Sequence, residues 1–273
     1  METSLHRVLK HHYADDRNCL EVPLGEYRID ALAGDWLVEI QHGTLAAIRD
    51  KVAALLKSHQ VLIVKPLLKS KQLIKRKKKD GRVIGRRKSP RRANWLDIFD
   101  ELLYFTRVFP HPRLAIEFVM VDIEEWRYPG HGRRRRWSKK DFVIEDQKLV
   151  EIHDATRLQR LEDLWSPLGD LQLPRPFHTG HLAEQLGVCR NTAQRIAYVM
   201  RETAAIKQVG KQGNAILYNR SKKGTAKINK AKKKQKSRRR ISLDPISEKN
   251  DPNKREPIEL TINARSPAIV QGL

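Results

Sequence analysis

The stretch Tyr27-Arg28-Ile29-Asp30-Ala31-Leu32-Ala33-Gly34-Asp35-Trp36-Leu37-Val38-Glu39-Ile40-Gln41 decides the fold. Two short strand-like runs, Glu26–Leu32 and Asp35–Gln41, flank Ala33-Gly34, which is the pattern of a hairpin with a tight turn. Successive side chains of a strand point to opposite faces, so Glu39 and Gln41 share one face. The hairpin brings Asp30 alongside them. The stretch therefore predicts two carboxylates and an amide that converge on an otherwise apolar hairpin.

The segments on either side of this hairpin complete an α/β core pattern. Leu5, Val8 and Leu9 recur at helical spacing before it. Leu45–Ser58 after it carries an apolar stripe typical of an amphipathic helix. Gln60–Leu68 has the apolar run of a buried strand, which we expect to stop near Pro66. The order helix, two strands, helix, strand predicts a mixed sheet flanked by helices.

Further elements extend this first domain to about residue 165. Lys71–Lys88 predicts a basic hairpin, because Asp80-Gly81 is a strong turn signal between two extended runs. A helix is expected over Trp95–Phe105 and an apolar strand over Arg113–Ile123, with a further strand pair around Arg136–Val150. We therefore predict one domain over residues 1–165, with its basic hairpin at 71–92.

The remainder of the chain divides into three parts. Residues 166–176 contain Pro and Gly and are expected to form a linker. Residues 177–220 predict a compact module with a helix that ends at Gly187, a second helix over Cys189–Glu202 and then a glycine-rich hairpin. Residues 221–273 are polar and rich in Lys, which is the composition of a disordered basic tail.

Charge points to a polyanionic partner. Lys and Arg number 55 against 32 Asp and Glu, a formal net charge of +23. Three runs concentrate it: fourteen Lys/Arg in Lys65–Arg92, the loop Arg133–Arg136, and eleven Lys/Arg in Ser221–Arg240. No apolar run is long enough to span a bilayer and no signal peptide is recognisable, so we expect a cytoplasmic protein, nucleoid-associated if bacterial, without a membrane partner. Cys19 and Cys189 are isolated, which argues against a disulfide framework or a zinc site.

The module at 177–220 resembles the winged helix-turn-helix family. The resemblance rests on Ala183, Gly187, the second helix and the hairpin with its basic tip. It implies a second helix that lies in the major groove of DNA and a wing that touches phosphate. The implied base-reading residues are Arg190, Asn191, Thr192, Gln194 and Arg195, and the implied phosphate contact is Lys211. Some winged helices serve as protein–protein modules instead.

The N-terminal part, residues 1–68, resembles the PD-(D/E)xK nuclease superfamily. Eight residues separate Asp30 from Glu39, within the usual range of that family, and Glu39-Ile40-Gln41 takes the place of its (D/E)xK. The resemblance implies a restriction-endonuclease-like sheet and Mg²⁺ or Mn²⁺ held by Asp30, Glu39 and the Ile40 carbonyl. Glu2, on the expected first helix, would be the extra acidic residue that many members carry.

One departure from the family pattern concerns catalysis. Gln41 stands where the family usually has lysine, which removes the cation that orients the nucleophile. Some members use glutamine there, so Asp30, Glu39 and Gln41 together remain the candidate catalytic residues. Lys51 or Lys65 could supply the missing charge.

Two functions from different classes follow. The first is a metal-dependent DNA endonuclease that is targeted by the winged helix. The second is a non-catalytic DNA-binding or regulatory protein on a nuclease-like scaffold, favoured by the missing lysine. A third, weaker hypothesis is an RNA- or ribosome-associated protein, favoured by the basic tail. DNA is the expected partner, and a homodimer is allowed.

Overall fold

The structure is a computed structural model that describes residues 2–130 and 141–221. All of these residues fall within one compact unit. The basic loop Arg133–Arg136 lies outside the described residues. Of the expected tail at 221–273, Ser221 alone is described.

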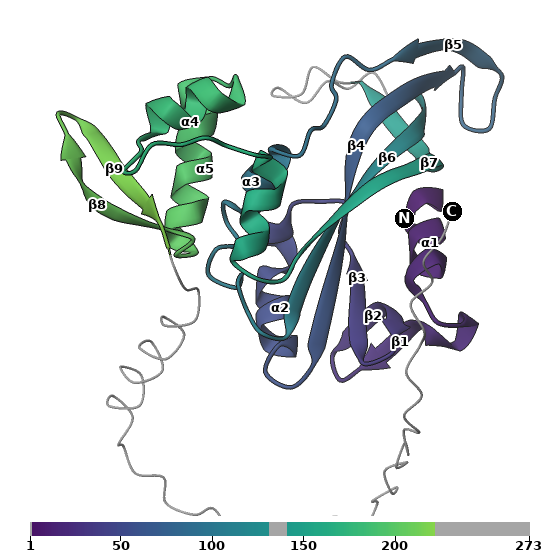
Figure 1. Cartoon of the computed structure of the whole chain (residues 1–273). Helices are drawn as coiled ribbons and strands as arrows, with labels where there is room; N and C mark the ends of the chain where they lie inside the picture. Colours follow the sequence, from purple (N-terminus) through teal and green to yellow (C-terminus); the bar gives the residue numbers. More distant parts are fainter. Residues whose placement is uncertain (1, 131–140, 222–273) are drawn as a thin grey trace, which may run out of the picture. The chain divides into compact units, whose positions relative to one another are not determined.

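A mixed seven-stranded sheet forms the centre of the fold (Figure 1). Its strand order is β1-β2-β3-β4-β6-β7, and β5 pairs with the far half of β4. The first three strands are antiparallel, β4 runs parallel to both β3 and β6, and β7 is antiparallel to β6. The bounds are β1 Leu20–Leu24, β2 Tyr27–Ala33, β3 Trp36–Ile40, β4 Gln60–Arg76, β5 Val83–Lys88, β6 Leu114–Pro129 and β7 Phe142–Leu158.

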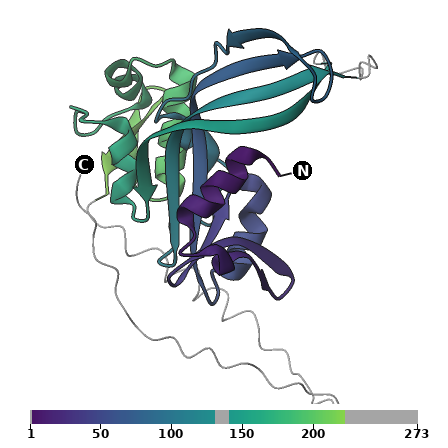
Figure 2. The same cartoon turned by 90° about the vertical axis from the view of Figure 1, so that its right-hand side faces the viewer.

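Helices cover both faces of this sheet. Helix α1 (Ser4–Tyr13) lies on one face, where Leu5 and Leu9 are fully buried (Figure 2). Helices α2 (Arg49–Leu55) and α3 (Asp97–Leu102) pack on the opposite face. Short 3₁₀ turns complete the domain: η1 (Arg17–Cys19), η2 (Leu45–Ile48) and η3 (Glu162–Leu168). The predicted α/β class, a mixed sheet flanked by helices, is confirmed.

Strand β4 is longer than expected. The prediction that it stops near Pro66 is wrong, because the strand continues to Arg76. Proline lacks the backbone N–H that a strand residue donates to the neighbouring strand on one side. The register explains why it is tolerated: β3 ends at Ile40 opposite Val64, so Pro66 has β6 as its neighbour and no β3 residue beside it. The basic hairpin is present, formed by the end of β4 and β5.

The C-terminal segment consists of two helices and a hairpin in the predicted order. Helix α4 (Thr179–Leu186) ends at Gly187, whose φ of +60° favours glycine. Helix α5 (Arg190–Glu202) follows, and then the hairpin of β8 (Ile206–Gln212) and β9 (Ala215–Arg220).

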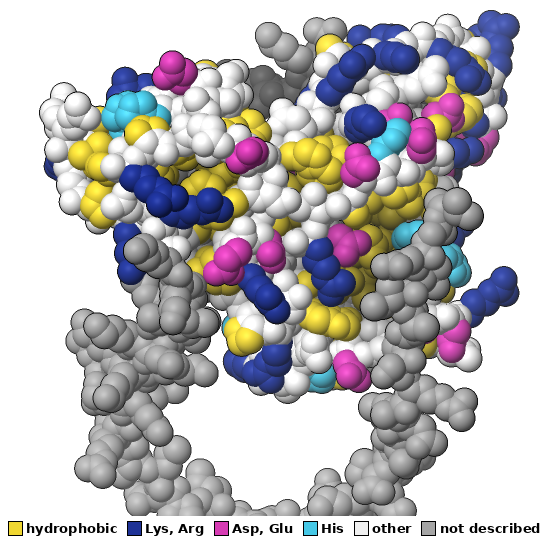
Figure 3. All heavy atoms as spheres, in the orientation of Figure 1, with side chains coloured by type: hydrophobic (Ala, Val, Ile, Leu, Met, Phe, Trp, Pro, Cys, Tyr) yellow, Lys and Arg dark blue, Asp and Glu magenta, His cyan; other side chains and the backbone are white. Residues whose placement is uncertain are grey.

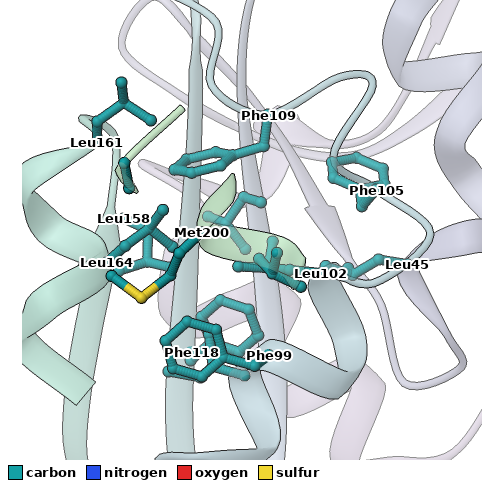
Figure 4. Packing of buried hydrophobic residues seen from close by; sticks show 14 of the residues in the cluster. Leu45, Phe99, Leu102, Phe105, Phe109, Phe118, Leu158, Leu161, Leu164 and Met200 are labelled. Atoms are coloured by element: carbon teal, nitrogen blue, oxygen red, sulfur yellow. The ribbon is translucent and has the colours of Figure 1, made fainter. Parts of the chain in front are cut away.

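This segment shares a hydrophobic core with the sheet. Met200 of α5 is 1% exposed and lies beside Leu158 and Leu164, in the same cluster as Phe99 and Phe118 beneath the sheet (Figure 4). The segment expected to be a linker, 166–176, begins inside η3, and its Leu168 is buried in this core. The two modules predicted from sequence therefore pack as one body.

Candidate functional site

The site begins where β2 and β3 separate. Their pairing runs from Ala33 opposite Trp36 to Ala31 opposite Val38. Beyond that pair the Asp30 carboxylate takes the position of a backbone acceptor, since its Oδ2 accepts the Ile40 N–H at 2.8 Å. The sequence-predicted Ile40 therefore meets Asp30 through its backbone amide. This arrangement fixes Asp30 at the edge of the hairpin, next to the strand that carries Glu39.

Helix α1 supplies a second contact to Asp30. His6 Nε2 lies 3.2 Å from Asp30 Oδ1, and the His6 ring stacks on His42 with ring centroids 5.4 Å apart. Burial works against ionisation of Asp30, but the hydrogen bonds from His6 and the Ile40 N–H outweigh it and lower the pKa of the carboxyl. Asp30 is therefore held as a carboxylate.

Glu39 is more deeply buried than Asp30. Its side chain is 8% exposed, against 20% for Asp30, and Lys51 Nζ of α2 lies 2.6 Å from its Oε1. Lys51 also donates to the Arg28 carbonyl at 2.8 Å, which orients its ammonium group. Burial raises the pKa of Glu39; Lys51 lowers it, the charge of Asp30 adds to the rise, and the net shift is upward. Glu39 is thus contacted by Lys51 of α2 and Asp30 by His6 of α1, and the two carboxylates are close enough for the charge of Asp30 to act on Glu39.

Gln41 directly follows β3, and Lys65 of β4 contacts the loop that Gln41 begins. Gln41 Nε2 donates to the Thr44 carbonyl at 2.8 Å. Lys65 Nζ donates to the His42 carbonyl at 3.0 Å and lies 3.2 Å from Glu101. Both side chains thus tie down the 42–44 loop. Of the two lysines that the sequence offered, Lys51 is the one that contacts a predicted carboxylate, that of Glu39.

Glu2 does not lie on the first helix, as the sequence predicted. Helix α1 begins at Ser4 because the Thr3 side chain caps it, which leaves Glu2 in the preceding extended segment. The Glu2 carboxylate pairs with Lys10 Nζ at 2.5 Å. Lys10 also contacts Glu21, and its charge helps to lower the pKa of Asp30. Glu2 therefore acts on the site through Lys10.

A second group of side chains, which sequence reasoning missed, could hold a metal ion. Asp122 of β6 and Glu151 and His153 of β7 each offer a ligand atom, and these atoms lie within 4.8 Å of one another. It is the one set of three metal-ligating side chains so close together within residues 2–130 and 141–221. Register explains the grouping, because Asp122 is paired with Glu151, and His153 lies two residues along on the same face.

The residues predicted to read DNA lie on α5. Arg190, Asn191, Gln194 and Arg195 are exposed and Thr192 is partly so, while Lys211 is exposed near the hairpin tip. Arg195 Nε also lies 3.1 Å from Asp100 of α3. Asn191, Gln194 and Arg195 line an open hollow of about 630 Å³ together with Leu103 and Tyr104, which follow α3. The exposed face of α5 thus borders α3, a neighbour that the local sequence pattern does not indicate.

Cations gather at the β5 end of the sheet. Figure 3 shows Lys and Arg side chains concentrated over this end, which carries the exposed Lys77, Lys78, Lys79, Arg82, Arg86 and Arg87. Among the residues that the structure describes, no helix has the length and apolar character needed to cross a membrane.

The chain was compared with known proteins. It is 28% identical over 225 residues to an uncharacterized protein of Treponema pallidum (strain Nichols), an alignment that covers 82% of this chain and 87% of the relative. No solved structure matches the chain. Residues 3–159, more than half of the chain, match a family model that spans the sheet and, apart from Glu2, the acidic residues discussed above. The protein therefore belongs to the family described as Domain of unknown function (DUF8091).

Proposed function

We propose that this protein is a metal-dependent DNA endonuclease that hydrolyses phosphodiester bonds. The observation that carries the proposal is the pair of carboxylates where β2 and β3 separate: Asp30, tied to the Ile40 N–H, and Glu39, buried on the next strand with Lys51 at 2.6 Å. The element order supports it too. A helix, a hairpin with Asp30 and Glu39, a second helix and a strand parallel to the hairpin's second strand follow one another in the order on which the resemblance to these nucleases rests.

The donor set at this site suits Mg²⁺ or Mn²⁺. Both residues offer carboxylate oxygens, the ligands that these hard cations prefer. The pKa of Glu39 stays above its usual value even with Lys51 beside it, because burial and the Asp30 charge outweigh the lysine. A divalent cation next to both carboxylates would favour their ionised forms and so oppose the rise in the pKa of Glu39. Asp30 and Glu39 would hold the ion.

Each residue then has a role in hydrolysis. A metal held by Asp30 and Glu39 would supply an acidified water molecule and would stabilise charge on the scissile phosphate. Lys51 favours the ionised form of Glu39 and would supply the positive charge that the nuclease pattern has in its lysine. His6 and the Ile40 N–H hold Asp30 as a carboxylate. Gln41 positions the loop after β3 rather than the reacting groups.

DNA recognition is assigned to the C-terminal module. Support comes from the order of helices α4 and α5 and the β8–β9 hairpin, which is the order that the resemblance to winged helix-turn-helix modules implies. The exposed α5 residues Arg190, Asn191, Thr192, Gln194 and Arg195 would meet base edges, and Lys211 would meet phosphate. The cations of the β5 end add contacts to the backbone of the duplex. On this proposal the protein acts in the cytoplasm.

One observation favours the alternative of a non-catalytic DNA binder. Lys51 and His6 already contact Glu39 and Asp30, so each carboxylate has a partner without a metal. Plasmid cleavage in the presence of Mg²⁺ or Mn²⁺ separates the two functions. The nuclease predicts nicking or linearisation by the wild type that Asp30→Ala abolishes and Asp122→Asn retains. If the wild type cleaves with neither metal, the protein is the non-catalytic binder. If Asp122→Asn abolishes cleavage and Asp30→Ala does not, the active centre lies at Asp122, Glu151 and His153 instead.

A further inference from the structure

A cleft of about 400 Å³ lies near the tip of the long β4, β6 and β7 strands, far along the sheet from Asp30. Four cations line it: Lys75 and Arg76 of β4, Arg87 of β5 and Arg127 of β6. Its remaining wall is largely apolar or aromatic and includes Ile84, Tyr128 and Phe142; one acid, Asp141, also lines it. Such a combination of positive charge and flat apolar surface suits a nucleotide better than a protein side chain.

Arg127 distinguishes this cleft from an ordinary basic surface. Its side chain is 10% exposed, and its guanidinium lies over the Phe142 ring at 4.4 Å from the centroid. Buried guanidinium groups normally form close hydrogen bonds to an acid. Arg127 Nε has no hydrogen-bond partner among the described residues, and the nearest carboxylate oxygen, of Glu125, is 3.8 Å from its Nη2.

Glu125 is already engaged by other groups. Its Oε2 accepts from Lys71 Nζ at 2.8 Å and from Gln147 Nε2 at 3.3 Å. Arg127 therefore keeps one donor, its Nε–H, that a phosphate in the cleft could use. Lys75 pairs directly with Arg127 across the strands, and Arg87 pairs with Leu73 on the same face, so three cations converge on one side of the sheet.

We propose that this cleft binds one nucleotide of an unpaired DNA strand, with its phosphate on Arg127 and its base against Phe142 and Ile84. This inference rests on DNA as the substrate of the proposed function and narrows it to DNA with an overhang, flap or fork. In a duplex the base is stacked inside the helix, whereas an unpaired base has a free face to place on an aromatic surface.

Binding of two labelled duplexes of equal paired length tests this inference. One is blunt and the other carries an overhang of about six thymidines. Fluorescence anisotropy is measured in EDTA with the full chain, so that no cleavage is needed. The wild type should bind the overhang duplex about tenfold more tightly than the blunt one. Phe142→Ala and Arg127→Lys should each remove that preference, since lysine keeps the charge of Arg127 but loses its planar fork.

The matched control is Arg86→Ala. Arg86 is the exposed neighbour of Arg87, pairs with Ile74 and lies on the other face of β5, so its loss removes one charge and leaves the cleft intact. This variant should weaken binding of both duplexes equally and keep the preference. Equal affinity of the wild type for the two duplexes, or an equal loss for both with Phe142→Ala, would overturn the inference. Failure of metal-dependent cleavage would overturn the nuclease and leave the overhang preference standing.

Discussion

Lys51 Nζ lies 2.6 Å from Glu39 Oε1, so a cation reaches the buried carboxylate from the helix that follows the hairpin. The side chain two residues after Glu39, Gln41, is turned to the Thr44 carbonyl instead. On the proposed function, Lys51 of α2 would therefore supply the positive charge that the nuclease pattern has on the strand. This relationship makes Lys51 the residue whose loss is most informative about how Glu39 works.

Lys51→Gln should move the acid limb of the pH–rate profile for Mg²⁺-dependent cleavage to higher pH. Lys51 lowers the pKa of Glu39 against burial and the charge of Asp30, so removing it lets that pKa rise further. Glu39 must be ionised to hold a metal, and each unit of pKa costs about tenfold in rate below the limb. Lys57→Gln is the control, because Lys57 is exposed just beyond α2. If the acid limb of the pH–rate profile stays at the wild-type pH in Lys51→Gln, Lys51 does not control the ionisation of Glu39.

His42 should make the fold sensitive to mild acid. Burial, then the charges of His6 and Lys65, lower its pKa from 6.5 to about 4. The unfolded chain therefore takes up this proton before the folded chain does, so stability is full above about pH 6.5 and is lost as the pH falls towards 4. The loss for this one group is about 3 kcal/mol. Urea unfolding of wild type and His42→Gln at both ends of this range should show a smaller decrease in the variant; equal decreases would contradict the assignment.

The contact between Arg195 and Asp100 should limit DNA binding. The two side chains lie 3.1 Å apart and both are about half exposed, so Asp100 competes with DNA for the arginine. Asp100→Asn should tighten binding several-fold at low salt, and Arg195→Ala should weaken it about tenfold. In the Arg195→Ala background, Asp100→Asn should have a clearly smaller effect. Asp50→Asn, a comparable loss of an exposed acid on α2, is the control. If Asp100→Asn tightens DNA binding by the same factor in the Arg195→Ala background, Asp100 acts by repelling the DNA phosphates and not by competing for Arg195.

Met200→Ala should destabilise the sheet and the C-terminal module together. Met200 is 1% exposed within a cluster that contains residues of both. Truncation of such a side chain costs about 2–5 kcal/mol. Urea denaturation followed by tryptophan fluorescence and by circular dichroism should give one coincident transition at a lower midpoint. Val209→Ala, at a side chain that is 51% exposed, should leave the midpoint nearly unchanged. Two separate transitions would mean that the modules unfold independently.

Features that depend on neighbours in the chain could be predicted from the sequence. The hairpin with Asp30 and Glu39 follows from strand alternation around Gly34, and the α4–α5 turn follows from Gly187, because both need only local backbone geometry. The α/β class follows from the order of such elements.

Features that depend on the register between distant strands could not be predicted from the sequence. Asp122 and His153 come together because β6 and β7 pair with bulges, and no local pattern indicates that pairing. Likewise, Pro66 suggested a strand end, since the sequence does not reveal that β3 has already ended beside it. The choice of Lys51 over Lys65 depends on how α2 packs on the sheet.

The most direct test of the central claim is to measure cleavage and binding of one DNA substrate by Asp30→Asn. Asp30 is proposed to hold the metal, and asparagine keeps the size of the side chain while removing its charge. The account predicts that Mg²⁺-dependent cleavage by the wild type disappears in the variant, whereas DNA affinity is unchanged or higher because a negative charge near the phosphates is lost. Cleavage that persists at the wild-type rate in Asp30→Asn would contradict it.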